Sequence, residues 1–199
     1  MSALSLIHAS DTQVARLAAF VDDLRALIVY SASEDELLSY GRALLAELVR
    51  HDDWLPDAYA ASSAQRYQQY PLHIDSAGRF SVVSFVWGPG QATPIHDHRV
   101  WGLVGVLRGA ELAESFAFDS EGALRSTGPA QRLGAGSVDA VSPRIGDIHR
   151  VANAYDDRVS ISIHVYGADI GRVERATYDR SGAPSRFVSG YAGLPALIA

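Results

Sequence analysis

Two histidines, His96 and His98, lie one residue apart in the segment GQATPIHDHRVWGLVGVLRG (90–109), in a chain with seven histidines among 199 residues. In a β-strand, residues i and i+2 point to the same face. The two imidazoles are therefore expected to point together, with Asp97 facing the other way in a structural contact. Two imidazoles at this spacing can share one metal ion if a distant strand supplies a third ligand. The alternative is a pair of core or surface histidines without a metal.

A third histidine in a strand-like segment is available as that ligand. His149 lies in GDIHRVAN, three residues after Gly146, which we expect in a turn. Three other histidines match no motif, and we expect them at the surface: His8, His51 and His73.

A second group of polar side chains follows in VSISIHVYG (159–167), where Ser162, His164 and Tyr166 alternate with three β-branched residues. Alternation places these three on one face of a strand. If that face points inward, each polar group needs a hydrogen-bond partner, because buried polar groups are almost always paired. Alternation alone leaves open whether this face points inward or to solvent.

Composition excludes several classes of chemistry. The chain has no cysteine, so disulfides, zinc–thiolate sites and cysteine nucleophiles are excluded. Its net charge is −6 and it lacks a basic stripe, so we expect no nucleic-acid partner. No apolar run reaches the ~18 residues that span a bilayer, and the N-terminus does not resemble a signal peptide. We therefore expect no membrane association and a cytoplasmic location. The sequence does not indicate an oligomeric state.

The elements that must position these residues fall into two groups. Helical periodicity covers 11–30, with Asp11 or Thr12 as N-cap, and 33–50, where Ser33 and Glu36 form a capping box. A third short helix is expected over 54–67, with Pro56 in its first turn. From about residue 70, short β-rich runs separated by turn residues predict an antiparallel sandwich or barrel. We expect one unit over 1–199, with a helical annex (1–66) and a β-barrel (67–199).

Glycines and histidines together form two motifs that resemble those of the cupin superfamily. The first motif comprises Gly90, His96, His98, Gly102 and Gly109, and the second ends with Gly146, His149 and Asn153. The resemblance implies a mainly β fold, the double-stranded β-helix (jelly-roll) barrel, with His96, His98 and His149 as metal ligands. Most metal-binding cupins have a glutamate ligand where this chain has Gly102, so the implied ligand set is neutral.

With the Ser162–His164–Tyr166 row after the third ligand, residues from about Tyr67 to Arg175 resemble the cysteine dioxygenase family of thiol dioxygenases. The resemblance implies an Fe(II) enzyme that adds both atoms of O2 to a small thiol and forms a sulfinic acid. It also implies a relay in which Ser162 orients His164 and His164 orients the catalytic Tyr166. Animal members cross-link that tyrosine to a cysteine, whose place is taken here by Gly102, so the cross-link is impossible.

The substrate-binding residues resemble one branch of the family more closely. Cysteine-specific members carry a carboxylate-binding arginine just before the barrel, where this chain has Gln69. Bacterial 3-mercaptopropionate dioxygenases share the Tyr-x-Gln-Tyr stretch, the His-Asp-His-x-Val-Trp-Gly run and a late arginine, which Arg175 matches. The resemblance implies that Arg175 and Gln69 bind the substrate, with 3-mercaptopropionate favoured over cysteine. Arg66 and Arg172 are competitors, and any of these arginines could be a surface charge.

Two other functions remain open. One is a three-histidine cupin of different chemistry, such as a diketone-type dioxygenase with nickel or manganese. The other is a non-catalytic cupin that binds a small molecule as a sensor. The Ser162–His164–Tyr166 row argues against both, since neither requires it, and the helical third lacks a basic helix-turn-helix. We expect Trp87 and Trp101 to pack the barrel and keep the site dry.

Overall fold

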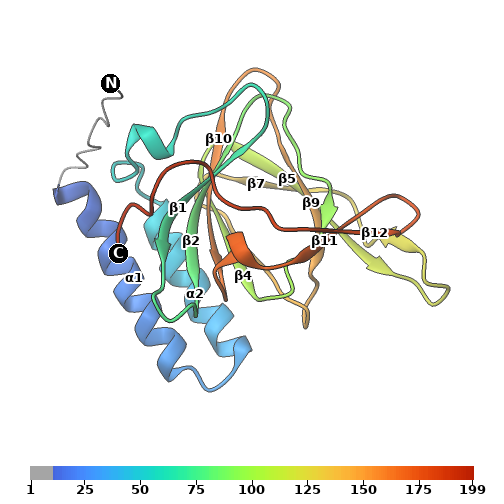
Figure 1. Cartoon of the computed structure of the whole chain (residues 1–199), viewed down its shortest axis with the longest axis horizontal. Helices are drawn as coiled ribbons and strands as arrows, with labels where there is room; N and C mark the ends of the chain where they lie inside the picture. Colours follow the sequence, from blue (N-terminus) through green and yellow to red (C-terminus); the bar gives the residue numbers. More distant parts are fainter. Residues whose placement is uncertain (1–10) are drawn as a thin grey trace.

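The computed structural model describes residues 11–199, in which two α-helices precede twelve strands arranged in two antiparallel sheets (Figure 1). The sheets face one another, and the helices lie against the outer face of one of them. This arrangement is the cupin double-stranded β-helix, or jelly roll, that the sequence motifs predicted.

The helices are α1 (Asp11–Tyr30) and α2 (Glu34–Val49), as predicted from periodicity. Ser33 caps α2 by accepting a hydrogen bond from the Glu36 amide at 3.2 Å, and the Glu36 carboxylate reaches back to the Ala32 amide at 2.8 Å. The second contact falls one residue before the cap, so the capping box is slightly shifted. The predicted N-cap of α1 at Asp11 or Thr12 lies outside the described side chains.

The predicted third helix is much shorter than expected. Only a 3-10 turn, η1 (Asp57–Tyr59), forms after Pro56. The Tyr59 carbonyl, which would accept a bond from the next helical turn, instead accepts the Ser84 hydroxyl at 2.9 Å. The Tyr59 hydroxyl donates to the Pro195 carbonyl at 3.0 Å. These contacts to distant parts of the chain end the helix after one turn.

The first sheet is packed against the helices. Its strands, in spatial order, are β1 (Gln68–Ile74), β2 (Ser81–Trp87), β10 (Ser160–Tyr166), β4 (Gly102–Arg108) and β8 (Val138–Val141). A Cβ added to Gly105 would lie 2.8 Å from Cγ of Leu45, so α2 approaches β4 closely. Ile161, Ile163 and Val165 of β10 are buried with the helical leucines in the larger hydrophobic core.

The second sheet closes the other side of the jelly roll. Its strands, in spatial order, are β12 (Pro184–Phe187), β11 (Arg175–Tyr178), β3 (Ile95–His96), β9 (Ile148–Asn153), β5 (Ala110–Phe118) and β6 (Leu124–Ser126), and β7 (Gln131–Gly134) also pairs with β5. A smaller core that includes Phe85, Trp87 and Tyr166 fills the space near the predicted site.

The C-terminal segment crosses the molecule after β12 and ends beside the helices (Figure 1). It follows the outer edge of β1, where the amides of Ala192 and Ile198 donate to the carbonyls of Gln69 (2.8 Å) and Leu72 (3.0 Å). The segment therefore pairs with an edge strand that would otherwise expose its backbone. A short 3-10 turn, η2 (Ile170–Arg172), connects β10 to β11.

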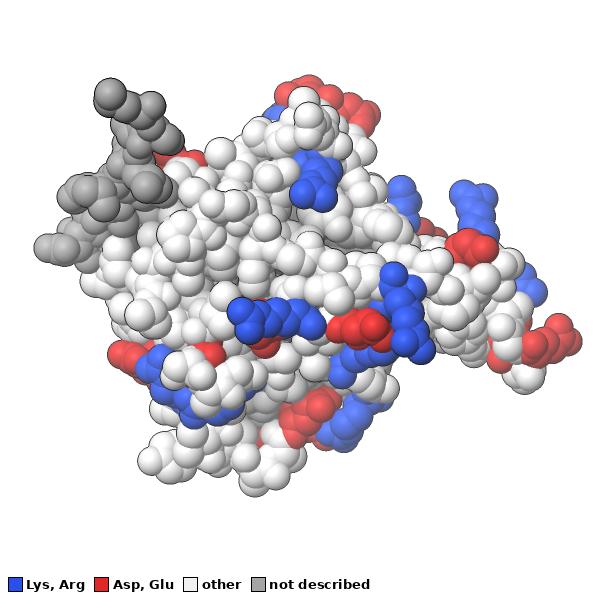
Figure 2. All heavy atoms as spheres, viewed as in Figure 1, with Lys and Arg blue, Asp and Glu red and all other residues white. Residues whose placement is uncertain are grey.

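Basic and acidic side chains are interspersed on the face shown in Figure 2. Among the described residues, no helix has both the length and the apolar character needed to cross a membrane.

Candidate metal centre and active site

The three histidines of the two motifs converge inside the jelly roll. His96 in β3 is the direct register partner of His149 in β9. His98 lies just beyond β3 rather than within it, as the strand is only two residues long. Nevertheless, one ring nitrogen from each of the three lies within 4.8 Å of the others. All three side chains are buried.

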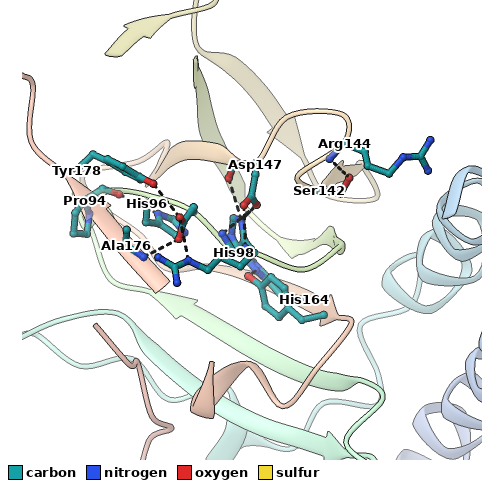
Figure 3. Close-up of polar contacts among 12 residues, drawn as sticks. Pro94, His96, His98, Ser142, Arg144, Asp147, His164, Ala176 and Tyr178 are labelled. Carbon is teal, nitrogen blue, oxygen red and sulfur yellow. Dashed lines mark hydrogen bonds and ion pairs between the residues drawn. The ribbon is translucent and has the colours of Figure 1, made fainter. Parts of the chain in front are cut away.

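Hydrogen bonds orient two of these rings and leave one nitrogen of each ring free for a metal (Figure 3). His96 Nδ1 lies 3.1 Å from the Pro94 carbonyl, and His98 Nδ1 lies 3.0 Å from the Asp147 carboxylate. Oxygen acceptors favour the N–H at Nδ1, which leaves the Nε2 lone pair available. His98 Nε2 is buried and has no partner among the described residues. An orphaned nitrogen facing two other imidazoles fits a bound divalent metal ion.

Burial keeps the rings of His96 and His149 neutral. Burial lowers the pKa of His96 to about 3, with a further contribution from the nearby His98. Burial also lowers the pKa of His149 well below its usual range. Because a metal binds the neutral imidazole, these shifts leave the lone pairs free near neutral pH.

Asp147 is a site residue that the motifs did not single out. Its carboxylate accepts hydrogen bonds from the backbone amides of His98 (3.0 Å) and Arg99 (2.9 Å) as well as from the His98 ring. Burial would raise the pKa of Asp147, but the bonds from His98 and the Arg99 amide outweigh it and the pKa is lowered. Arg99 has φ of 61°, an unfavourable value for a residue with a side chain. Asp147 therefore holds both a candidate ligand and the strained backbone that follows it.

Asp97 faces away from the histidines, as predicted. Its carboxylate accepts bonds from the Ala176 amide at 2.7 Å and the Tyr178 hydroxyl at 3.0 Å (Figure 3). These contacts attach the loop after β3 to β11.

The row on β10 points into the jelly roll, so the solvent-facing alternative is wrong. Ser162 Oγ lies 2.8 Å from His164 Nε2, and His164 Nδ1 lies 2.8 Å from the Tyr166 hydroxyl. Phe85 stacks on the His164 ring at 3.9 Å, and the Tyr166 ring stacks on His98 at 5.4 Å. A continuous hydrogen-bonded chain thus runs from the interior to the histidine cluster.

The two titratable members of this row remain neutral. Burial lowers the pKa of His164 well below its usual range and raises the pKa of Tyr166 above its usual range. A neutral histidine has one N–H and one acceptor nitrogen, and a neutral tyrosine can both donate and accept.

Gly102 provides the space that the tyrosine occupies. A Cβ at Gly102 would lie 2.9 Å from Cδ1 of Tyr166 and 3.1 Å from Cγ2 of Val141. Any side chain at this position would press on the tyrosine ring.

Beside the row, one contact of a predicted residue and one further buried residue were not foreseen. Trp87 was expected to pack the barrel, and it is fully buried, but its indole N–H also donates to Ser162 Oγ at 3.1 Å. Glu111 on β5 is fully buried, and its carboxylate oxygens have no hydrogen-bond partner of good geometry among the described residues. Trp101, the other predicted packing residue, lies against Gly167.

A cavity of about 190 Å³ is lined by one histidine of the cluster, one residue of the row and both predicted substrate-binding residues. Its lining includes Tyr67, Gln69, Phe85, Thr93, Pro94, His96, Tyr166, Arg175, Thr177 and Phe187. Of these, Tyr67 was part of the predicted Tyr-x-Gln-Tyr stretch, but no role was assigned to it. None of the lining residues is acidic.

Arg175 is buried beside this cavity, so the surface-charge alternative is wrong for this residue. Only 4% of Arg175 is exposed. Its Nη2 donates to Ser189 Oγ at 2.8 Å, and the guanidinium lies 4.7 Å above the Phe187 ring. Within residues 14–199, no acidic side chain forms an ion pair with Arg175, and its Nε has no partner. Gln69 Oε1 is also buried without a partner.

The competing arginines do not line this cavity. Arg172 has 88% of its side chain exposed and pairs with Asp169 at 3.3 Å. Arg66 is exposed and lines a separate surface hollow.

Among the histidines without a motif, His73 is not at the surface as expected. It is 1% exposed, and its ring lies 5.3 Å from the Phe80 ring in a tilted arrangement, because β1 is covered by the helices and the C-terminal segment. His51 is partly exposed and lies 3.4 Å from Glu47. His8 lies outside the described residues.

The fold and the histidine cluster define a cupin with a three-histidine site suited to a metal ion. The sequence profile of cysteine dioxygenase type I matches residues 42–181, and the chain belongs to this family. It is therefore a cupin of a metal-dependent family of thiol dioxygenases. The match covers the histidine cluster, the row on β10 and Arg175.

Two solved structures are among those similar to the chain. One is an uncharacterized conserved protein with a double-stranded β-helix domain from Klebsiella pneumoniae (18% identity, 65% of this chain and 98% of that chain, TM-score 0.49). The other is a cupin superfamily protein from Desulfitobacterium hafniense (16% identity, 60% of this chain and 94% of that chain, TM-score 0.43). At these identities the similarity concerns the fold alone.

Proposed function

We propose that this protein is an Fe(II)-dependent thiol dioxygenase that adds both atoms of O2 to a small thiol carboxylate and yields a sulfinic acid. The favoured substrate is 3-mercaptopropionate rather than cysteine. One observation carries the proposal: a single cavity is lined by His96 of the histidine cluster, by Tyr166 at the end of the β10 row and by the buried Arg175, which has no acidic partner among the described residues.

The histidine cluster would hold the metal through His96, His98 and His149. Three imidazoles suit Fe(II), which accepts nitrogen ligands and keeps further coordination positions open. When bound, the ion would lower the pKa of the substrate thiol and provide adjacent positions for the thiolate and O2. Because the three ligands are neutral, they leave the positive charge uncompensated and favour an anionic substrate.

Arg175 would bind the substrate carboxylate. A buried guanidinium without a counter-ion is unfavourable, and burial lowers the pKa of Arg175. A carboxylate in the cavity would remove this cost through charge-assisted and, where geometry allows, bidentate hydrogen bonds. Ser189 and Phe187 both contact the guanidinium and fix its orientation beside the cavity.

The absence of acidic residues from the cavity lining favours a substrate without an ammonium group. The ammonium of cysteine would have no carboxylate partner there, whereas 3-mercaptopropionate carries only a thiol and a carboxylate. Gln69 places an uncharged amide where cysteine-specific members of the family have an arginine.

Tyr166 would contact the bound substrate as the catalytic residue of the row. Its hydroxyl is fixed by His164, which in turn is fixed by Ser162 and by stacking on Phe85. Phe85 and Phe187 line the cavity and give it apolar surface.

Oxygen uptake by the iron-loaded protein tests this function with three thiols: 3-mercaptopropionate, cysteine and cysteamine. We expect the order 3-mercaptopropionate, then cysteine, then cysteamine, which lacks the carboxylate. With ¹⁸O2, the product mass should show two labelled oxygen atoms. Equal rates with cysteamine would contradict the carboxylate site, and an absence of thiol-dependent uptake would favour another cupin chemistry or a binding function.

A further inference from the structure

The outer face of the second sheet carries apolar side chains at the surface. The helices pack on the first sheet, and this face points away from them (Figure 1). On β5, Leu112 is 37% exposed and Phe118 is 45% exposed. A hollow of about 700 Å³ lies over the same strands, and Ile95, Phe116 and Leu124 contribute apolar lining to it. Apolar side chains gathered at a surface hollow are typical of an interaction surface.

Strand alternation identifies the side chains on this face. Glu111 of β5 and His149 of β9 are buried inside the jelly roll, so their neighbours in each strand point outward. The outward residues form two adjacent rows, which the antiparallel register joins in pairs: Leu112 with Ala152, Glu114 with Arg150, and Phe116 with Ile148. The row on β5 is therefore apolar, acidic and apolar, and the row on β9 is apolar, basic and apolar.

The two charges at the centre of these rows have no partner among the described residues. Glu114 is half-buried and Arg150 is exposed, and both line the hollow. Although they are register partners, no ion pair joins them or links either one to another described side chain. Charged groups in an interaction surface are matched by opposite charges on the partner. The partner should therefore place a base opposite Glu114 and an acid opposite Arg150, in an apolar setting.

A second copy of the chain meets this requirement. A two-fold axis that lies in the interface, parallel to β5 and β9 and midway between them, brings each row against the other row of the second copy. Glu114 then faces the partner's Arg150, and Phe116 faces the partner's Ile148. Because the interface is two-fold, each of these contacts occurs twice. The face is thus complementary to itself in both charge and apolar character.

We propose that the outer face of the second sheet is the interface of a two-fold homodimer, in which Glu114 of each copy pairs with Arg150 of the partner subunit within an apolar contact. The strands at this interface include β9 and the adjacent β3, whose inner side carries His149 and His96. The second copy therefore supports two candidate metal ligands from behind. The inference does not depend on the proposed function.

An ion pair within one chain is the alternative for these two charges. Opposite charges directly across two strands attract each other, so Glu114 and Arg150 have a possible partner in their own sheet. Charge reversal distinguishes the two arrangements, because only a pair between copies changes the association of the chains.

Sedimentation equilibrium of the full chain between about 1 and 100 μM measures this association. We expect a dimer for the wild type. Glu114→Arg and Arg150→Glu each place like charges at both symmetry-related contacts, so each variant should raise the dimer Kd by more than about 100-fold. The double variant Glu114→Arg/Arg150→Glu restores opposite charges, and its Kd should lie within about tenfold of the wild-type value.

An equimolar mixture of the two single variants is the most specific sample. One copy then carries arginine at both positions and the other carries glutamate at both, so the two-fold interface regains opposite charges at both contacts. Each single variant should be monomeric alone, and their mixture should sediment as a dimer. An ion pair within one chain is not restored by mixing. Association of the mixture also shows that both single variants are folded.

Glu47→Arg on α2 is the matched control, since it reverses the charge of a side chain that is 57% exposed and lies on the helical side of the molecule. It should associate as the wild type does. A wild type that stays monomeric at the highest concentration would overturn the proposal and leave this face to a different partner. A wild-type dimer that neither reversal weakens would place the interface elsewhere. Single variants that remain monomeric when mixed would exclude the two-fold pairing.

Discussion

His96 and His149 are register partners across β3 and β9, so the pairing of two short strands places two candidate ligands face to face. The third, His98, reaches them from a loop that Asp147 holds in place. The cluster therefore depends on backbone pairing and on one carboxylate.

Replacing His149 by Ala should remove one of the three candidate ligands and lower metal affinity by more than about 100-fold. The loss should exceed that caused by removing a residue that only hydrogen-bonds to a ligand. Metal content after dialysis and calorimetric titration with Fe(II) would measure this. His51→Ala, which changes a partly exposed histidine, is the matched control. Metal retained at wild-type affinity by His149→Ala would exclude this residue as a ligand.

Asp147→Asn should lower metal affinity by about 10–100-fold, because the His98 ring loses its charged acceptor. The stability of the fold should also fall, since the Arg99 amide at positive φ loses a charge-assisted bond. Calorimetry and urea unfolding would measure the two effects. The exposed Asp157, whose carboxylate pairs with Arg158 beside it, offers Asp157→Asn as control. Unchanged affinity would mean that the His98 orientation is set elsewhere.

Site residues that form a local sequence pattern could be predicted from the sequence. Residues that reach the site only through contacts made by the folded chain could not. The His96–His98 pair, the β10 alternation and the Ser33 cap are local patterns. By contrast, β3 has only two residues and exists because β9 and β11 flank it. Glu111 and Glu114 look alike in the sequence, yet only the register of β5 buries the first.

The same reason explains why Ser189 was not foreseen. It contacts Arg175 because β12 pairs with β11 and the C-terminal segment then turns toward β1. No local pattern near Ser189 carries that information. The family resemblance identified the arginine, and only the fold identified the residue that holds it.

Replacing Arg175 by Gln should raise KM for 3-mercaptopropionate by about 30-fold or more, since lost charge-assisted pairing costs about 2 kcal/mol or more. Activity with cysteamine should be unaffected, because it has no carboxylate. Arg172→Gln is the control, as this arginine is exposed. An unchanged KM in Arg175→Gln would place the carboxylate site elsewhere.

Gly102→Ala should destabilise the protein by about 1–3 kcal/mol, because the added methyl meets the Tyr166 ring on one side and Val141 on the other. The displaced ring should also weaken the bond between Tyr166 and His164. Urea unfolding measures the first effect and thiol-dependent oxygen uptake the second. Gly134→Ala, at a strand position with open space around its Cα, should leave both unchanged. Full activity in Gly102→Ala would show that Tyr166 tolerates a shift.

The stability of the protein should depend on pH through Glu111. Its pKa is raised from 4.5 to about 7, so the folded state holds a proton that the unfolded chain releases earlier. Both states are protonated below pH 4.5, and the wild type loses stability as pH rises toward 7, by about 3 kcal/mol in all. Glu111→Gln has no such proton, so its free energy of unfolding should exceed that of the wild type increasingly over this range and by a constant amount above it. Urea unfolding at a series of pH values measures the difference, with Glu114→Gln expected to follow the wild type. Parallel curves for wild type and Glu111→Gln would mean that this carboxyl ionises as easily in the folded protein as in the unfolded chain.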